Sequence, residues 1–141
     1  MSEEELYGTY TLSSSTRHMA DTGEVIPLGS EQGFITYSSD GRVLCLVIRG
    51  RRPKVTSIEK MTDRERVQLF NSMLSYGGTY KFDGKTMEHH IDIAWNEVWT
   101  GTTLIRDVRR SGKQLIYTTR PAPDPSDGRL GFNTVVWEKI G

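Results

Sequence analysis

The sequence is poor in the features that mark several large classes of protein. It has one cysteine in 141 residues, equal numbers of basic and acidic side chains (18 of each) and no apolar run as long as a membrane span of about 20 residues. A single cysteine excludes an intrachain disulfide and a cysteine-rich metal site. The charge balance argues against nucleic-acid binding, which needs an excess of Lys and Arg. The chain starts with Met-Ser-Glu-Glu-Glu, which is acidic, unlike a signal peptide. We therefore expect a cytoplasmic protein with neither a nucleic-acid nor a membrane partner.

Motifs for common cofactors and nucleophiles are also missing. The sequence contains no nucleophile elbow, P-loop, dinucleotide fingerprint or His-Glu-x-x-His motif. His89 and His90 are adjacent, and neighbouring residues of a strand point to opposite faces, so the two imidazoles do not easily share a metal ion. The expectation is a protein without cofactor or metal.

Glycine is abundant, with 14 residues, and turn signals divide the chain into short strand-like segments. Asp40-Gly41 is a strong hairpin signal, because both positions tolerate positive φ. The run Val43–Arg49 is short, apolar and rich in β-branched residues, as in a strand buried on both faces. The predicted strands are 8–14, 33–38, 43–49, 78–82, 86–94, 102–109, 114–120 and 131–140.

One segment has helical periodicity instead. Thr62 and Glu65 form a capping-box motif, and Gly77-Gly78 is a typical helix end. The apolar residues between them recur at helical spacing, at Val67, Phe70, Met73 and Leu74. These features predict one short helix near 62–76 that lies across a sheet or plugs the end of a barrel.

About eight to ten strands joined mostly by short turns predict an all-β fold, an antiparallel meander that closes into a β-barrel. Closure removes the unpaired edges of the sheet. A barrel of about eight strands is just wide enough for side chains or for one small ligand. No repeat or linker interrupts the pattern, so residues 1–141 are expected to form a single domain.

The alternation of side chains along two strands places polar groups inside such a barrel. His89 shares a predicted face with Met87, Ile91, Ile93 and Trp95. Arg106 falls between Leu104 and Val108 on the face of the next strand. A polar group on an apolar face needs a partner, because an unpaired buried group costs about 1–3 kcal/mol and more when it is charged.

Several motifs follow one another along nearly the whole chain. They are Gly8-Thr9-Tyr10, Gly33-Phe34-Ile35-Thr36-Tyr37, Tyr76-Gly77-Gly78-Thr79-Tyr80, Met87-Glu88-His89-His90-Ile91, Trp99-Thr100-Gly101-Thr102 with Arg106, and Val136-Trp137-Glu138. In order and spacing they resemble the bacterial and fungal lipocalin-like domain proteins. The motif residues of that family map to Tyr10, Tyr37, Tyr80, His89, Trp99, Gly101, Thr102, Arg106 and Trp137. The sequence departs from the family pattern at Asp107 and at 95–98, so the packing beside Arg106 and the shape of the rim are expected to differ.

The resemblance implies a stand-alone lipocalin-like barrel with a central cavity for a small, mostly apolar molecule. Some relatives look like natural-product tailoring enzymes. The resemblance by itself does not fix a reaction.

The candidate catalytic residues are His89, Arg106 and Tyr80. His89 has an unperturbed pKa of about 6.5, suited to acid–base work, and its alternative role is that of a core histidine bonded to a neighbour such as Tyr80. Arg106 could hold a carboxylate, an enolate or an oxyanion, or it could close the barrel by stacking on Tyr10. The candidate ligand-binding residues are Tyr37, Tyr76, Trp95, Trp99, Tyr117 and Asn133.

These observations predict a cofactor-free isomerase, cyclase or lyase that acts on a small, largely apolar metabolite. In it His89 would move the proton, while Arg106 and a tyrosine would stabilise negative charge. The alternatives are a non-catalytic carrier or sensor of a small hydrophobic ligand and, third, a structural subunit. The sequence leaves open whether the protein forms a homodimer.

Overall fold

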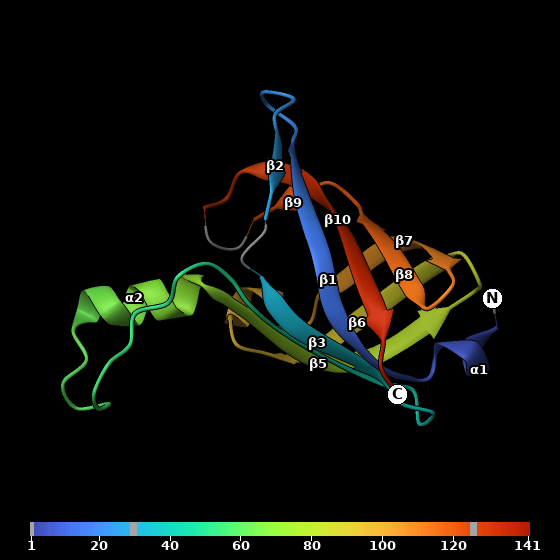
Figure 1. Ribbon diagram of the computed structural model, residues 1–141, viewed down its shortest axis with the longest axis horizontal. Coiled ribbons are helices and arrows are strands. Elements are labelled where there is room, and N and C mark those ends of the chain that lie inside the picture. The colour runs from blue at the N-terminus through green and yellow to red at the C-terminus, as the bar shows by residue number, and fades with distance from the viewer. Residues whose placement is uncertain (1, 29–30, 125–126) are drawn as a thin grey trace.

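The computed structural model describes residues 2–28, 31–124 and 127–141, which contain ten strands and three short helices (Figure 1). The helices are α1 (Glu3–Leu6), α2 (Asp63–Asn71) and the 3-10 helix η1 (Glu97–Trp99). The strands are β1 (Gly8–Met19), β2 (Val25–Pro27), β3 (Gln32–Tyr37), β4 (Arg42–Ile48), β5 (Met73–Phe82), β6 (Thr86–Ala94), β7 (Thr103–Ser111), β8 (Gln114–Thr119), β9 (Ala122–Pro123) and β10 (Leu130–Lys139). None of the helices in these ranges is long and apolar enough to cross a membrane.

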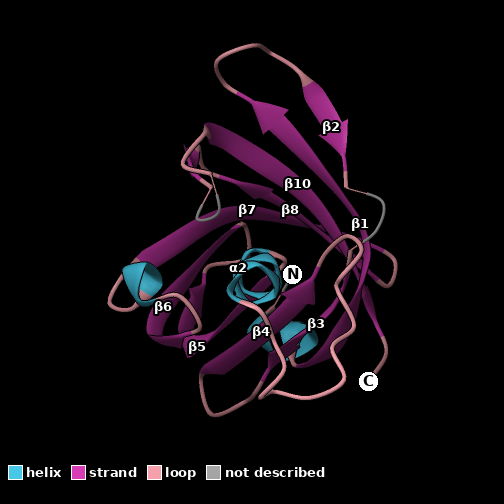
Figure 2. Cartoon of the chain, turned by 90° about the vertical axis from the view of Figure 1, so that its left-hand side faces the viewer, coloured by secondary structure: helices cyan, strands magenta, loops and turns pink. Residues whose placement is uncertain are grey.

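Eight strands close into an antiparallel barrel in the order β1-β3-β4-β5-β6-β7-β8-β10, because β10 pairs with β1. The predicted fold class is therefore confirmed. β1 is longer than expected: its first half pairs with β3, its second half pairs with β2, and β10 follows most of its length. The short strands β2 and β9 extend the sheet beside one end of the barrel and were not predicted. Figure 2 looks at this end.

The predicted helix is present, but it ends at Asn71 and not near residue 76. Its capping box forms as expected, with the Glu65 N–H donating to Thr62 Oγ1 over 3.1 Å. Met73 instead begins β5, because 73–79 pair residue by residue with β4. No residue of α2 is buried, and α2 lies outside the open end of the barrel without plugging it (Figures 1 and 2).

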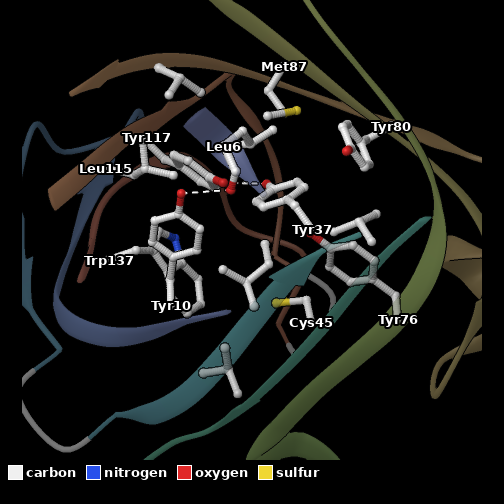
Figure 3. Packing of buried hydrophobic residues seen from close by; sticks show 14 of the residues in the cluster. Leu6, Tyr10, Tyr37, Cys45, Tyr76, Tyr80, Met87, Leu115, Tyr117 and Trp137 are labelled. Atoms are coloured by element: carbon white, nitrogen blue, oxygen red, sulfur yellow. Dashed lines mark hydrogen bonds between the residues drawn. The ribbon is translucent and has the colours of Figure 1, made fainter. Parts of the chain in front are cut away.

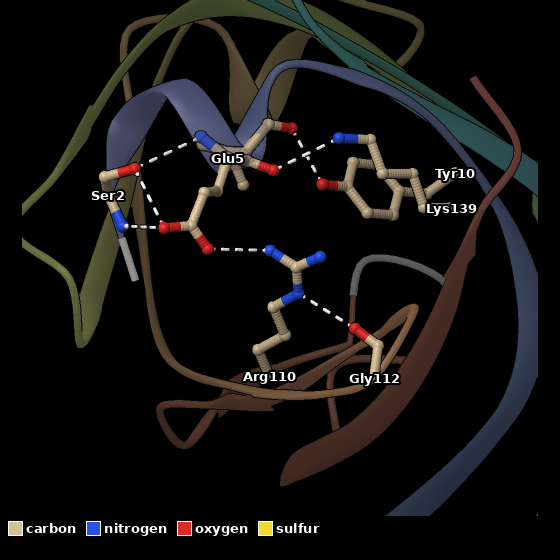
Figure 4. Close-up of polar contacts among 7 residues, drawn as sticks. Ser2, Glu5, Tyr10, Arg110, Gly112 and Lys139 are labelled. Atoms are coloured by element: carbon tan, nitrogen blue, oxygen red, sulfur yellow. Dashed lines mark hydrogen bonds and ion pairs between the residues drawn. The ribbon is translucent and has the colours of Figure 1, made fainter.

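The opposite end of the barrel is closed by the N-terminal segment. Leu6 is completely buried, and its carbonyl oxygen accepts a hydrogen bond from the hydroxyl of Tyr10 over 2.7 Å. Glu5 fastens this segment to the rim, since its carboxylate lies 2.9 Å from Arg110 and its carbonyl accepts from Lys139 (Figure 4). The buried core of the barrel is rich in tyrosine (Figure 3).

A bulge corrects the predicted face of the strand at 86–95. Met87, His89 and Ile91 are buried as expected, but Ile93 is 65% exposed. The pairing of β5 with β6 shifts between Gly77 and Gly78, so that the residues beyond Ile91 change sides. A β-bulge places two residues of one strand opposite one residue of its partner, and the alternation along a single strand does not reveal where this happens.

Candidate functional site

The open end of the barrel leads into a cavity of about 280 Å³. This volume is near the lower end of the range for ligand sites, so the cavity suits a small molecule. Its walls are mostly apolar and come from seven of the eight barrel strands, all but β6, and from Trp99 of η1. The apolar lining residues include Leu12, Ile35, Val47, Leu74, Trp99, Val135 and Trp137.

A hydrogen-bonded network of five side chains crosses the barrel at the inner end of the cavity; we call it the tyrosine–histidine network. Arg106 Nη2 donates to the hydroxyl of Tyr76 over 3.2 Å. The Tyr76 hydroxyl lies 2.6 Å from Nδ1 of His89, and the Tyr37 hydroxyl lies 2.6 Å from Nε2. Tyr37 is in turn hydrogen-bonded to Tyr117. Figure 3 shows the three tyrosine rings converging from β3, β5 and β8.

Burial holds the titratable members of this network in their neutral forms at pH 7. Burial, assisted by the nearby charges of Arg106 and His90, lowers the pKa of His89 well below its usual value. Burial also raises the pKa of Tyr37, Tyr76 and Tyr117 above the ordinary tyrosine value. Arg106 keeps its proton, because a guanidinium is not deprotonated in proteins.

Arg106 is the one charged member of the network. Among the residues that the structure describes, no carboxylate pairs with it. Its Nη1 is buried and has no hydrogen-bond partner there. Two other cavity-lining side chains also have a buried donor without a partner in that part of the chain, Arg49 at Nε and Trp137 at Nε1. All three unpaired groups are donors, which complement an oxygen acceptor or an anion.

Charged groups surround the outer part of the cavity. Arg49 Nη1 lies 3.7 Å from Asp124, and Arg17 Nη1 donates to the Asn133 side chain over 3.2 Å. Burial raises the pKa of the Glu31 carboxyl, and the charge of Arg49 opposes that shift. These groups make the entrance polar, whereas the walls behind it are apolar.

Five of the nine predicted site residues line the cavity: Arg106, Tyr76, Trp99, Tyr117 and Asn133. The structure does not bring the other four into its lining.

Two of these four residues, His89 and Tyr37, belong to the network behind the lining. His89 is completely buried, and both of its ring nitrogens are occupied by tyrosine hydroxyls. The imidazole therefore does not face the cavity directly.

The other two lie farther from it. The hydroxyl of Tyr80 donates to the Ser38 carbonyl over 2.8 Å, and the indole N–H of Trp95 donates to the Phe70 carbonyl at the end of α2.

Other contacts also differ from the alternatives weighed for His89 and Arg106. The hydrogen-bond partners of His89 are Tyr37 and Tyr76, and Tyr80 is not one of them. The cation that lies over the Tyr10 ring is Lys139, at 5.9 Å from the ring centroid. The sequence analysis had considered Arg106 for this cation–π contact.

Sequence reasoning missed several lining residues. The run 43–49 was predicted to be buried on both faces, but Leu44 and Leu46 are exposed, so this prediction is wrong. Alternation on the strands could have identified Leu12, Cys45 and Val47 as inward-facing. No local signal marks Glu31 or Arg49, which reach the cavity only because the ends of β3 and β4 meet at its entrance. No group of three or more His, Cys, Asp or Glu side chains in the described ranges could hold a metal ion.

The fold and the cavity define a β-barrel of the kind that generally binds small hydrophobic ligands. The chain matches the lipocalin-like domain family over residues 7–140 and therefore belongs to that family. Comparison with curated proteins gives no significant match.

Proposed function

We propose that the protein binds a small, largely apolar metabolite bearing an anionic or enolisable oxygen, and acts on it as a cofactor-free isomerase, cyclase or lyase. The observation that carries the proposal is Arg106, a guanidinium in the wall of a mostly apolar cavity that has no carboxylate partner among the residues described by the structure. The proposal treats residues 1–141 as one functional unit.

The charge of Arg106 carries a free-energy cost in the folded protein. A buried charge without a counter-charge destabilises the folded state by several kcal/mol, at the order of magnitude seen when one partner of a buried pair is removed. A barrel that carried only hydrocarbon would be more stable with an apolar residue there. A ligand oxygen that is negative, or becomes negative during a reaction, would supply the missing counter-charge.

The roles of the individual residues follow from their positions. Arg106 would stabilise negative charge that develops in the cavity, and Tyr76 and Tyr117 would provide hydroxyl groups at its inner end. His89 would act only through these tyrosines, because it does not line the cavity. We assign no ligand contact to Tyr80, whose hydroxyl donates to Ser38.

A carrier or sensor of a small apolar acid is the second candidate. The complete burial of His89 favours it, because the imidazole of His89 does not face the ligand. Arg106 would bind the acid of such a ligand equally well, so binding alone does not separate the two functions.

Binding of an anion can be tested with p-nitrophenol, whose phenolate has a distinct absorbance. Arg106 is expected to stabilise the bound phenolate and lower the pKa of the bound probe. Arg106→Gln should remove this shift, whereas Arg109→Gln, which changes an exposed arginine on the same strand, should retain it. Nitrobenzene, a neutral probe of similar size, should quench tryptophan fluorescence alike in all three proteins. An unshifted probe pKa in the wild-type protein would contradict the proposal.

Catalysis can be tested with phenylacetone in D₂O, by following the loss of its α-proton signal in NMR spectra. An isomerase-type site should accelerate this exchange above the buffer rate, and nitrobenzene should inhibit it by competition. Tight binding of p-nitrophenolate without any exchange would favour the carrier.

A further inference from the structure

We propose that the tyrosine–histidine network is a directional proton relay that joins two points of the cavity wall, with Tyr117 as the acid and Tyr76 as the base. This inference rests on the proposed function and adds a route for the proton. It also gives roles to Tyr37 and His89, which no ligand in the cavity would touch.

The first argument is the path itself. The network is continuous, because each side chain from Arg106 through Tyr76, His89 and Tyr37 to Tyr117 is hydrogen-bonded to the next. Arg106, Tyr76 and Tyr117 line the cavity, whereas His89 and Tyr37, which lie between the two lining tyrosines, do not. A proton that enters at one end can therefore leave at the other while the interior of the network stays inaccessible to the ligand.

The second argument is polarity. An arginine can only donate, so Tyr76 accepts from Arg106 and its own proton is free to point to Nδ1 of His89. A neutral imidazole then carries its proton on Nε2 and donates it to Tyr37, which donates to Tyr117. The proton of Tyr117 is left for the ligand. The charge of Arg106 favours this direction, because every O–H and N–H dipole then points its positive end away from the cation.

The proton transfer balances without a co-reactant. For a ketone, Tyr117 gives its proton to the carbonyl oxygen while Tyr37, His89 and Tyr76 each pass one proton along the network. The phenolate that develops on Tyr76 is stabilised by Arg106 and removes the proton from the neighbouring carbon. The C–H electron pair becomes the C=C bond, and the carbonyl π pair forms the new O–H bond. The product is the enol, and the network is left with its opposite polarity. A water molecule that enters the vacated cavity restores it by taking a proton from Tyr76 and giving one to Tyr117.

A purely structural role for the network makes a different prediction. If these groups only filled the barrel, the loss of one hydroxyl would alter stability and leave any exchange rate per folded molecule unchanged. A relay instead fails wherever it is interrupted, even at a position that the ligand does not touch. Tyr37 is such a position.

The test compares Tyr37→Phe with Tyr10→Phe. Tyr10 is also buried and also loses a hydrogen bond, but its partner is the Leu6 carbonyl outside the network. With phenylacetone at saturation in D₂O, Tyr37→Phe should lower the exchange rate about 100-fold, the usual scale of acid–base catalysis, and Tyr10→Phe should leave it within about threefold of wild type. Both variants should bind nitrobenzene with the wild-type Kd.

The possible outcomes separate the relay from the proposed function. Exchange by the wild-type protein that persists in Tyr37→Phe would overturn the relay and leave the proposed function standing. No exchange by the wild-type protein would overturn both.

The polarity has an independent test that needs no substrate. The ¹⁵N shifts of His89 should show a neutral ring protonated at Nε2, and Arg106→Gln should produce a mixture of tautomers. A ring protonated at Nδ1 in the wild-type protein would overturn the assigned direction.

Discussion

The hydroxyl of Tyr76 lies 2.6 Å from Nδ1 of His89, so on this side the imidazole is connected to the cavity through a tyrosine that lines it. Burial is the largest cause of the lowered His89 pKa, and the charge of Arg106 adds to it, because both oppose a positive charge on the ring. The histidine at the centre of the barrel is thus a neutral hydrogen-bonding group at physiological pH.

This state of His89 predicts a pH dependence of stability. The folded-state pKa is lowered, so below pH 6.5 the unfolded chain binds a proton that the folded protein does not. The free energy of unfolding should therefore fall with decreasing pH below about 6.5, with a slope of up to about 1.4 kcal/mol per pH unit from this residue. Urea unfolding of wild type and His89→Gln between pH 7.5 and 4.5 isolates the slope.

The titratable and charged groups that face His89 are Tyr37, Tyr76 and Arg106, and none of them titrates in this range, because burial raises the pKa of both tyrosines and the guanidinium keeps its proton. Should His89→Gln fail to fold, the ring protons of wild-type His89 provide a second measurement. Their NMR shifts should show no titration near pH 6.5, and a normal titration there would contradict the prediction.

Arg106 should make the protein less stable than an apolar residue would. Arg106→Met retains much of the side-chain length and removes the charge that has no carboxylate partner in the described ranges. We expect the free energy of unfolding to rise by about 1 kcal/mol or more, as happens when buried charged groups are replaced by apolar ones. Urea denaturation measures it, with Arg109→Met as the exposed control. A marked loss of stability would mean that the donation to Tyr76 outweighs the cost of burial.

Two adjacent glycines in β5 should respond very differently to substitution. A Cβ at Gly78 would lie 1.9 Å from the His90 carbonyl oxygen, which belongs to the backbone and cannot move easily. A Cβ at Gly77 would meet its nearest atom, the Ile93 side chain, at 3.3 Å. Gly78→Ala should therefore cost about 1–3 kcal/mol or prevent folding, whereas Gly77→Ala should stay within about 1 kcal/mol of wild type. If both substitutions changed thermal stability equally, the backbone of the bulge would have to move to make room for the Cβ at position 78.

Cys45 should be chemically inert in the folded protein although it lines the cavity. Burial raises the pKa of its thiol to about 12 and so suppresses the reactive thiolate at pH 8. Labelling by iodoacetamide should be on the order of a thousandfold slower than in the urea-unfolded chain, whose thiol has a pKa of about 8.5. Mass spectrometry follows the reaction, and nitrobenzene should slow it further by occupying the cavity. A rate equal to that of the unfolded chain would contradict the burial of this residue.

Much of the fold could be predicted from local patterns. Short apolar alternations and Gly-containing turns identified eight of the ten strands, and the motif order identified the family. The end of α2 was misplaced because Met73 and Leu74 fit both a helical stripe and a strand, and only pairing with β4 decides between them. The two strands that were missed, β2 and β9, are two or three residues long and carry too little pattern to be recognised.

The candidate site was predictable only in part. The inward orientation of His89 and Arg106 follows from alternation with their apolar neighbours, and both do point into the barrel interior. The partners of His89 did not follow, because Tyr37 lies 52 residues away along the chain. Whether a side chain reaches a ligand depends on how deep it lies in the barrel, and that depth is set by the register in which its strand pairs with its neighbours.

The amino-acid sequence by itself determined that this chain alternates strands with turns and places an imidazole and a guanidinium among apolar side chains. Those features are local, since they depend on residues within a few positions of one another. The tertiary structure alone decided that β1 pairs with β10, that the bulge opposite Gly77 and Gly78 turns Ile93 outward, and that two tyrosines from different strands hydrogen-bond to one histidine. Such contacts arise only when the sheet closes, because closure fixes the stagger of every strand and so the depth of each side chain.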